Sequence, residues 1–254
     1  MPTTGFPHSA DLASPRSTVA SLSDNTQLRH GETQRQPIDA PHGRRSRVGA
    51  PAVPPSGLIF RENISYIRLR RAFDISVASV VLALLTPLLL VVAFAIVVED
   101  GAPIFFHQRR VGRFGRLFTI HKLRTMRKDK CIDTLSPTSR HDPRVTRVGH
   151  WLRRLSIDEL PQLLNIIRGD MAFVGPRPEM PFIVRKYESW QHLRSLVTPG
   201  VTGVWQITCR KTVPLHLPEA TLIDIDYIRK ASCRTDALIL AKTVPALLST
   251  QGAY

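Results

Sequence analysis

The sequence predicts an α-rich α/β fold that is attached to a membrane from one side, which is a monotopic fold. One uncharged apolar run occupies residues 75–98, and basic residues flank it on both sides. The chain after this run alternates between short strand-like and helical patterns. We therefore expect a kinked re-entrant membrane helix, followed by a cytoplasmic domain with a short β-hairpin and interfacial amphipathic helices.

These patterns divide the chain into three regions. Residues 1–60 are expected to form a disordered N-terminal tail, because they are rich in Pro, Ser, Thr, Arg and Gln and lack apolar periodicity. The tail has no apolar core of the kind found in signal peptides, so export is not expected. Residues 61–100 are the expected re-entrant membrane anchor, and residues 101–254 are the expected cytoplasmic catalytic domain.

The apolar run is long enough to cross a bilayer. As a straight helix it would measure ~36 Å, against a hydrocarbon core of ~30 Å. Pro87 lies inside the run and predicts a kink, because proline lacks a backbone donor and clashes with the preceding turn. Thr86 is placed to satisfy a carbonyl group that the kink frees.

Positive charge on both flanks indicates that both ends of the run stay on the cytoplasmic side. The basic flanking residues are Arg68, Arg70, Arg71, Arg109, Arg110, Arg113 and Arg116. A helix that enters the bilayer and returns satisfies both the kink and the charges. Two alternatives stay open, namely a kinked helix that spans the membrane and a long buried helix of a soluble protein.

Residues 104–126 predict a β-hairpin, with apolar segments on either side of a Gly112-x-x-Gly115 turn. Lys122 and Arg124 alternate on the second strand, so their side chains should share one face. That face is either an anion-binding surface or a solvated surface near lipid headgroups.

Helices are predicted in three later segments. Residues 140–155 contain a turn followed by a short helix, and residues 180–193 and 236–248 read as amphipathic helices. Aromatic and basic residues beside apolar stripes suit helices that lie in a membrane interface. Ordinary core packing explains the same stripes.

An acidic pair, Asp158 and Glu159, is predicted at the start of a helix. Ser156 resembles an N-cap with Glu159 three residues later, which is the pattern of a capping box. The apolar stripe that follows predicts a packed helical face, and it consists of Leu160, Leu163, Leu164 and Ile167.

This placement suggests phosphoryl chemistry. A carboxylate is a weak nucleophile that attacks phosphorus when the developing charge is offset. Free N–H groups at a helix start and the charge of Arg154 would favour ionised Asp158. Glu159 beside it works against ionisation unless a hard divalent cation such as Mg²⁺ bridges the two carboxylates. The alternative is structural, because acids are common in the first turn of a helix.

Composition narrows the range of partners. The formal net charge of +15 and the pI of about 10.8 favour polyanions such as nucleic acid, anionic lipid or phosphorylated substrates. The Gly112–Gly115 turn weakly supports nucleic acid, but there is no helix-turn-helix pattern, so no nucleic-acid partner is expected. Three widely spaced cysteines argue against disulfides or a zinc site and fit a reducing compartment.

Residues 68–254 resemble the bacterial sugar transferases, which are monotopic polyprenyl-phosphate hexose-1-phosphate transferases. The motifs that carry the resemblance are RRAFDISVAS, FFHQRRVGRFGRLFTIHKLRTM, DPRVTRVGHWLRRLSIDELPQLLNIIRGDMAFVGPRPE, PGVTGVWQITCR and IDIDYI. The resemblance implies a UDP-sugar donor, an undecaprenyl phosphate acceptor and contact with membrane lipids. It also implies Mg²⁺ as cofactor and a place on the cytoplasmic face of the bacterial inner membrane, and it leaves a homodimer open.

The resemblance also implies roles for individual residues. Asp158 matches a nucleophile that forms a phosphosugar-aspartyl intermediate and releases UMP, and Glu159 matches the magnesium-binding acid of the pair. Pro87, after Thr86, matches a helix-breaking proline of the re-entrant anchor. The matches expected to bind substrate are Lys122, Arg124, Arg154, Arg210 and the loop Gly175–Glu179, which contains Pro176 and Arg177.

The chain departs from the family pattern at some positions. Thr198 stands where an arginine usually precedes Pro199, and the usual Asn-Gly-Arg is Thr208-Cys209-Arg210. The loss of that glycine could shift the loop that carries Arg210. A catalytically inactive membrane scaffold of the same family is therefore the alternative to an active enzyme.

Overall fold

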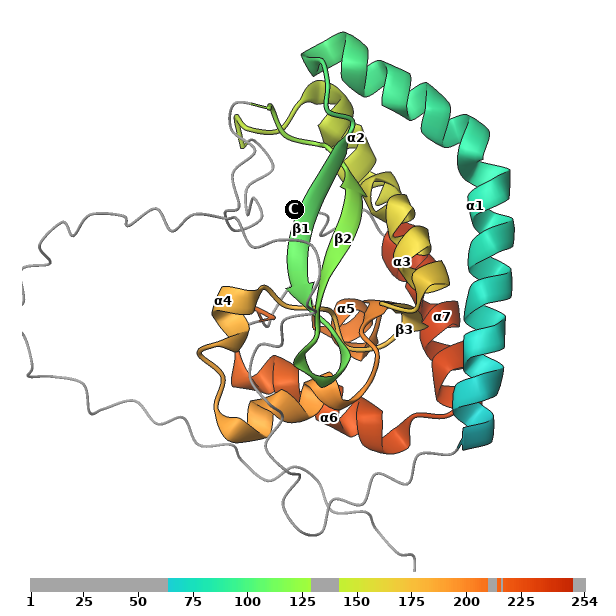
Figure 1. Ribbon diagram of the computed structural model, residues 1–254, viewed down its shortest axis with the longest axis vertical. Coiled ribbons are helices and arrows are strands. Elements are labelled where there is room, and N and C mark those ends of the chain that lie inside the picture. The colour runs from blue at the N-terminus through green and yellow to red at the C-terminus, as the bar shows by residue number, and fades with distance from the viewer. Residues whose placement is uncertain (1–63, 129–141, 210–213, 216, 249–254) are drawn as a thin grey trace, which may run out of the picture. The chain divides into compact units, whose positions relative to one another are not determined.

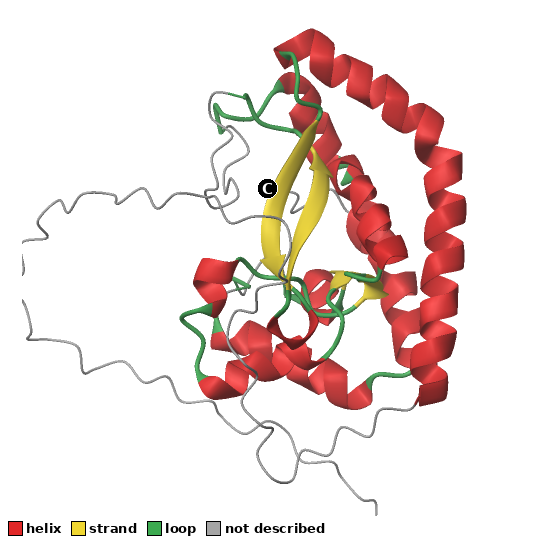
Figure 2. Cartoon of the chain, viewed as in Figure 1, coloured by secondary structure: helices red, strands yellow, loops and turns green. Residues whose placement is uncertain are grey.

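The computed structural model describes residues 64–128, 142–209, 214–215 and 217–248. The predicted tail 1–60 and Arg210 lie outside these residues. The described chain consists mainly of helices with two small sheets (Figure 1, Figure 2). The α-helices are α1 (Ile64–Asp100), α2 (Arg147–Arg154), α3 (Leu163–Arg168), α4 (Pro181–Val184), α5 (Val204–Thr208), α6 (Pro218–Lys230) and α7 (Cys233–Leu248). The strands are β1 (Phe105–Val111), β2 (Leu117–Leu123), β3 (Ala172–Val174) and β4 (Gly200–Thr202), and the 3-10 helices are η1 (Arg113–Gly115), η2 (Ile157–Gln162) and η3 (Ser189–Leu196).

Helix α1 contains the whole apolar run and continues through Pro87 as one helix of 37 residues. It bends in its C-terminal half, which is the half that contains Pro87 (Figure 1). The Thr86 hydroxyl donates a hydrogen bond of 2.8 Å to the Leu82 carbonyl. Pro87 frees the carbonyl of Ala83, four residues before it. Thr86 therefore supports the turn next to the freed carbonyl and does not replace the lost bond.

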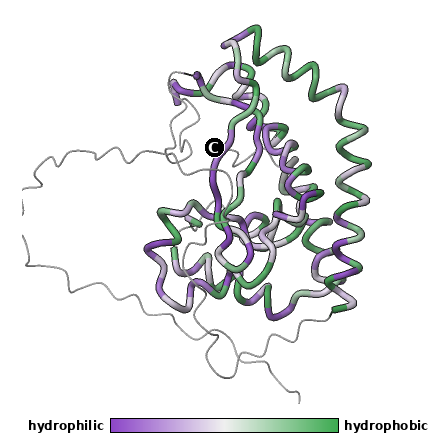
Figure 3. Tube along the Cα trace, viewed as in Figure 1, coloured by the Kyte–Doolittle hydropathy of each residue, from purple (hydrophilic) through white to green (hydrophobic). Residues whose placement is uncertain are grey.

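Figure 3 shows that most of α1 is apolar. Most of its residues are also exposed. Within the described residues it is the one helix long and apolar enough to cross a membrane, and only 11% of its most hydrophobic window is buried. A core helix of a soluble protein would be mostly buried, so this exposure argues against that alternative and indicates membrane association.

Both ends of α1 contact the same domain. Near the N-terminal end, the Arg71 guanidinium donates hydrogen bonds to the carbonyl groups of Ile166 and Ile167 in α3. Near the C-terminal end, the Glu99 carboxylate accepts hydrogen bonds of 2.7 and 2.9 Å from two backbone N–H groups in the first turn of α2. About 40 Å of helix separates these two attachments.

The predicted β-hairpin is confirmed. Strands β1 and β2 pair in antiparallel register, from Phe105 opposite Leu123 to Val111 opposite Leu117. The turn between them contains η1, where Phe114 adopts a left-handed backbone conformation. Strands β3 and β4 form a second, parallel pair.

The core lies between the hairpin, α3 and α1. Ala78 of α1 packs with Ile120 of β2 and with Leu163 and Ile166 of α3. Farther along α1, another group joins the hairpin and α2 to its C-terminal half, and it consists of Val92, Ile96, Leu123 and Leu152. In the predicted stripe after the acidic pair, Leu163 is buried and Ile167 packs partly buried against the same core. Two residues outside the stripe, Asn165 and Ile166, have no exposure.

Two predictions about helix ends are wrong. The helix expected over residues 180–193 is divided into α4 and η3, and the capping box lies at Glu188 and Gln191. The capping box expected at Ser156 is absent, because Ser156 has a left-handed conformation (φ 55°, ψ 23°) and its side chain caps nothing.

The helix expected over 236–248 is confirmed, because α7 contains it with Pro245 inside.

Candidate active site

The acidic pair lies on η2, a 3-10 helix packed against β2. Pro161 within η2 has no backbone N–H group to donate, and regular α-helix begins only at Leu163. In this turn Asp158 is buried, with 7% of its surface exposed, while Glu159 is partly exposed. The two neighbouring carboxylates therefore occupy different environments.

Glu159 is held by two cations. Its Oε1 atom lies 2.8 Å from Nζ of Lys122 and 2.8 Å from Nη2 of Arg177. Nη1 of Arg177 lies 3.5 Å from Oε2. Lys122 comes from β2 and Arg177 from the loop Gly175–Glu179, so three segments that are distant in sequence meet at this carboxylate.

The surroundings move the pKa values of the two acids apart. Burial raises the pKa of Glu159, but Arg177 and Lys122 outweigh it and hold the pKa well below its usual range. Burial raises the pKa of Asp158 to about 6; Lys122 opposes this rise and the Glu159 charge adds to it. Arg153 and Arg177 also favour the ionised form of Asp158. The pair thus holds one firmly ionised carboxylate and one carboxylate that titrates near neutral pH.

Asp158 has no hydrogen-bond partner in the described part of the chain, and neither of its oxygens is among the fully enclosed unpaired atoms there. Its carboxylate is thus buried but still reachable. This combination suits a nucleophile, because hydrogen bonds that stabilise the carboxylate charge would lower its reactivity.

Of the two arginines at the end of α2, Arg153 and not Arg154 is among the charges that favour ionised Asp158. Arg154 is exposed and its guanidinium lies over the Trp151 ring, 5.4 Å from the centroid. Arg153 is partly buried, donates a 2.8 Å hydrogen bond to the Thr125 hydroxyl and acts on the charge of Asp158. A shift of one residue rotates a side chain by about 100° around a helix, which is enough to change its partner.

Arg124 also lies away from the acidic pair. Its guanidinium is buried and lies 3.3 Å from the Asp100 carboxylate, and it donates hydrogen bonds to the carbonyl groups of Asp100 and Gly101. Strand β2 ends at Leu123, so the alternation that predicted a shared face with Lys122 stops before Arg124. Arg124 secures the end of the membrane helix.

The loop Gly175–Glu179 brings Arg177 to the acidic pair. Pro176 contributes through its carbonyl group, which accepts a 2.9 Å hydrogen bond from the Gly200 N–H. The backbones approach so closely here that a Cβ atom on Gly200 would lie 2.1 Å from the Gly175 nitrogen. Only glycine fits at this position, which explains the Pro199-Gly200 pattern in physical terms.

A model of the family described as "Bacterial sugar transferase" matches residues 65–250. The chain belongs to the bacterial sugar transferase family. The exopolysaccharide production protein ExoY of Rhizobium meliloti is 40% identical over 202 residues, which cover 73% of this chain and 88% of that protein. The UDP-glucose:undecaprenyl-phosphate glucose-1-phosphate transferase of Caulobacter vibrioides is 40% identical over 200 residues, covering 73% of this chain and 72% of its own length. The undecaprenyl-phosphate glucose phosphotransferase of Komagataeibacter xylinus is 38% identical over 195 residues, covering 73% of this chain and 37% of its own length.

The donor set of this sugar transferase fits a magnesium ion shared with a substrate. Within the described ranges no group of three or more His, Cys, Asp and Glu residues gathers at one point. Mg²⁺ commonly takes only one or two protein carboxylates and completes its shell with water and substrate phosphates. Within the described residues Asp158 has no hydrogen-bond partner and Oε2 of Glu159 has only the 3.5 Å contact with Arg177, so both can supply oxygen ligands.

Proposed function

We propose that this sugar transferase moves a hexose-1-phosphate from a UDP-sugar to undecaprenyl phosphate, as the first membrane step of exopolysaccharide, capsule or O-antigen synthesis. The observation that carries the proposal is the buried carboxylate of Asp158, which has no hydrogen-bond partner among the described residues and lies beside the Lys122–Glu159–Arg177 cluster. The names of the relatives in Caulobacter vibrioides and Komagataeibacter xylinus support the acceptor and the transferred group.

The reaction proceeds in two displacements at phosphorus. A carboxylate oxygen of Asp158 attacks the phosphorus that bears the hexose, and the bond from that phosphorus to the UMP oxygen breaks, so UMP leaves. An oxygen of undecaprenyl phosphate then attacks the same phosphorus and breaks its bond to Asp158. The carboxylate is regenerated, and the product is a lipid-linked diphosphate sugar.

The cations around Glu159 offset the charge that develops on the transferred phosphoryl group. Lys122 and Arg177 both contact Glu159 and bear on Asp158, so they lie where a phosphate held between the two acids would need donors. Bound Mg²⁺, held by Glu159 and Asp158, would neutralise the diphosphate and favour departure of UMP. Arg210, which lies outside the described residues, is proposed as a further phosphate-binding residue.

We propose that α1 enters the cytoplasmic leaflet and returns, without spanning the bilayer. Its two ends are bound to one domain, through Arg71 and Glu99 respectively. A spanning helix would place one of these attachments on the far side of the membrane from its partner. The bend near Pro87 lets the apolar middle of the helix enter the lipid while both ends remain at the headgroups.

Cysteine labelling tests this topology. In a variant without native cysteines, Ser65→Cys and Ala102→Cys place one thiol near each end of α1. We expect both thiols to resist a membrane-impermeant maleimide in intact spheroplasts, which expose the periplasmic face, and to react in inverted vesicles. Reaction of either thiol in intact spheroplasts would refute the re-entrant helix.

The pKa of Asp158 predicts the acid limb of the pH–rate profile. The ionised carboxylate attacks, so kcat/KM should fall as the pH drops through about 6. Lys122 is the strongest charge favouring ionisation, so Lys122→Met should raise the pKa of Asp158 and move the limb to higher pH. The control is Lys230→Met, because Lys230 pairs with Asp226 on an exposed surface. A limb that does not move in Lys122→Met would contradict the assigned charges.

Intact-mass spectrometry tests the function directly. The purified protein is incubated with Mg²⁺ and a panel of UDP-sugars, first without a lipid acceptor. We expect a hexose-phosphate mass addition with the correct donor, and its loss together with product formation when undecaprenyl phosphate is added. No mass addition and no UMP release with any donor would favour the inactive scaffold.

A further inference from the structure

Other elements hold the loop that carries Arg177 through hydrogen bonds to its backbone carbonyl groups. Two of its five residues are prolines, so the loop has few N–H groups through which other elements could hold it. Five of the six carbonyl groups from Val174 to Glu179 accept hydrogen bonds from other elements. The donors are Arg70 to Val174, the Gly200 N–H to Pro176, Arg194 to Arg177, Arg110 to Pro178 and the Val111 N–H to Glu179.

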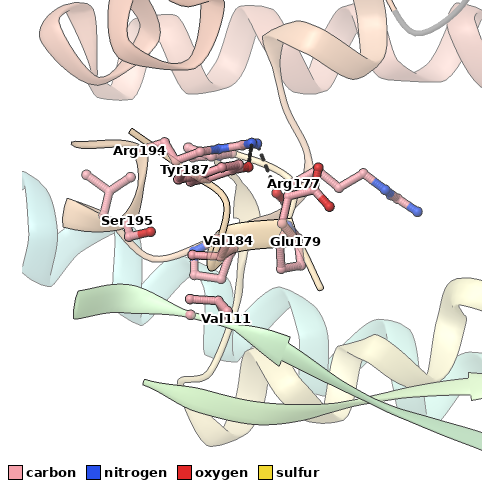
Figure 4. Close-up of a pocket in the computed structure, with 12 residues that line it drawn as sticks. Val111, Arg177, Glu179, Val184, Tyr187, Arg194 and Ser195 are labelled. Atoms are coloured by element: carbon pink, nitrogen blue, oxygen red, sulfur yellow. Dashed lines mark hydrogen bonds between the residues drawn. The ribbon is translucent and has the colours of Figure 1, made fainter. Parts of the chain in front are cut away.

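Arg194 of η3 makes the contact nearest to the Arg177 side chain. Its Nη2 atom donates a 3.2 Å hydrogen bond to the Arg177 carbonyl and lies 2.6 Å from Oδ2 of Asp224. Its Nη1 atom donates a 2.7 Å hydrogen bond to the Tyr187 hydroxyl. Figure 4 shows Arg194 beside Tyr187, with the Arg177 side chain extending away from both. One guanidinium thus joins α6, the segment after α4 and the loop.

The ion pair between Arg194 and Asp224 is almost fully withdrawn from water, because the exposed fractions of the two residues are 5% and 2%. Burial raises the pKa of Asp224 to about 6 even though Arg194 opposes the rise. A buried ion pair often contributes no more stability than apolar residues of the same shape would. The cost of this pair points to a role in fixing geometry.

Arg177 contacts the Arg194–Asp224 ion pair through its backbone and not through its side chain. The carbonyl of Arg177 is fixed from one side by Arg194, while its guanidinium reaches Glu159 on the other side, 2.8 Å from Oε1. Movement of the backbone at this residue would carry the guanidinium with it and change the charge balance at the acidic pair.

We propose that Arg194, held by Asp224 and Tyr187, is a positioning residue that acts through Arg177 on the Asp158–Glu159 pair. The inference rests on the proposed function for its kinetic consequences, but not for its structural ones. Lysine cannot replace Arg194, because its single ammonium lacks the planar fork that donates to a hydroxyl and a carbonyl in fixed directions while pairing with a carboxylate.

A double-mutant cycle tests the proposal. Arg194→Lys should lower kcat by about tenfold to a hundredfold, which is the scale of a displacement of about 1 Å in a positioned group. The double variant Arg194→Lys, Arg177→Lys should be no slower than Arg177→Lys alone, within about threefold, because both changes disturb one group. The matched control is Arg71→Lys, since Arg71 also donates to carbonyl groups but outside this loop, and its effect should multiply with that of Arg177→Lys.

The pH profile separates positioning from a general loss of structure. Arg177 favours ionised Asp158, so its displacement should move the acid limb to higher pH in Arg194→Lys and in Arg177→Lys, and not in Arg71→Lys. Multiplicative losses in the cycle would overturn the proposal. If Arg194→Lys does not fold, Tyr187→Phe removes a single hydrogen bond to Arg194 and should show the same coupling with a smaller loss.

Hydrogen exchange gives a result that does not depend on activity. The peptide spanning residues 174–184 should exchange faster in Arg194→Lys than in the wild type and should be unchanged in Arg71→Lys. If this holds while no UDP-sugar is turned over, the positioning contact stands and the proposed function fails. Unchanged exchange in Arg194→Lys would reject the positioning contact, whatever the activity.

Discussion

Replacing Asp158 by asparagine should abolish both the covalent intermediate and the product. Asparagine keeps the shape of the side chain but cannot form the phosphosugar-aspartyl bond, so kcat should fall by about 10⁴-fold or more, as when a covalent nucleophile is removed. The measurements are UMP release and the intact mass of the protein with donor. Substantial residual turnover would contradict the covalent mechanism, since direct attack by the lipid phosphate would then account for the reaction.

The same variant should be at least as stable as the wild type. A folded-state pKa raised from 3.8 to about 6 means that the ionised carboxylate destabilises the fold at neutral pH. A pKa rise of this size corresponds to about 3 kcal/mol in the free energy of unfolding. We expect Asp158→Asn to recover about 1–2 kcal/mol of it, because the amide must also be desolvated. The penalty is present above pH 6 and disappears below 3.8, where the acid is protonated in both states.

Thermal unfolding at two pH values checks this sign. The melting temperature of Asp158→Asn should exceed that of the wild type at pH 7.5, and the difference should shrink at pH 4.5. A lower melting temperature at pH 7.5 would mean that Asp158 is a structural acid. The lost activity would then need a different explanation.

Local patterns predicted the parts of the fold that local physics determines. The hairpin follows from alternation around Gly112 and Gly115, and the membrane helix follows from an uncharged run with one proline. These features depend on residues within a few positions of each other. The backbone conformation at the acidic pair was not predicted. A left-handed Ser156 and a 3-10 helix that contains Pro161 stand where a capped α-helix was expected.

The charge environment of the site was the least predictable part. Glu159 is paired with Lys122 and Arg177, which are 37 and 18 residues away along the chain. The sequence identified both cations as candidates, but not that they would converge on one oxygen. From the sequence we chose Arg154 and missed Arg153. The two residues are neighbours in the last turn of α2, and the orientation of this helix decides which of them faces the site. Arg194 gave no local signal, since its partners lie in three separate segments.

Replacing Glu159 by glutamine should give the second large loss, by a different route. The amide cannot carry the charge that pairs with Lys122 and Arg177, and it is a poorer ligand for Mg²⁺. We expect kcat to fall by about 10²- to 10³-fold, which is the scale of one lost electrostatic contact in an active site. The Mg²⁺ concentration that gives half-maximal rate should rise. Glu219→Gln, on an exposed turn of α6, is the matched control.

The pH profile of this variant separates the roles of the two acids. The Glu159 charge raises the pKa of Asp158, so its removal leaves Lys122, Arg153 and Arg177 to favour the ionised form. The acid limb should therefore move to lower pH in Glu159→Gln, opposite to its movement in Lys122→Met. The enzyme would then be slower although its nucleophile is more fully ionised. Such a result assigns Glu159 to charge neutralisation and metal binding, whereas a limb that moved to higher pH would mean that Glu159 promotes ionisation of Asp158.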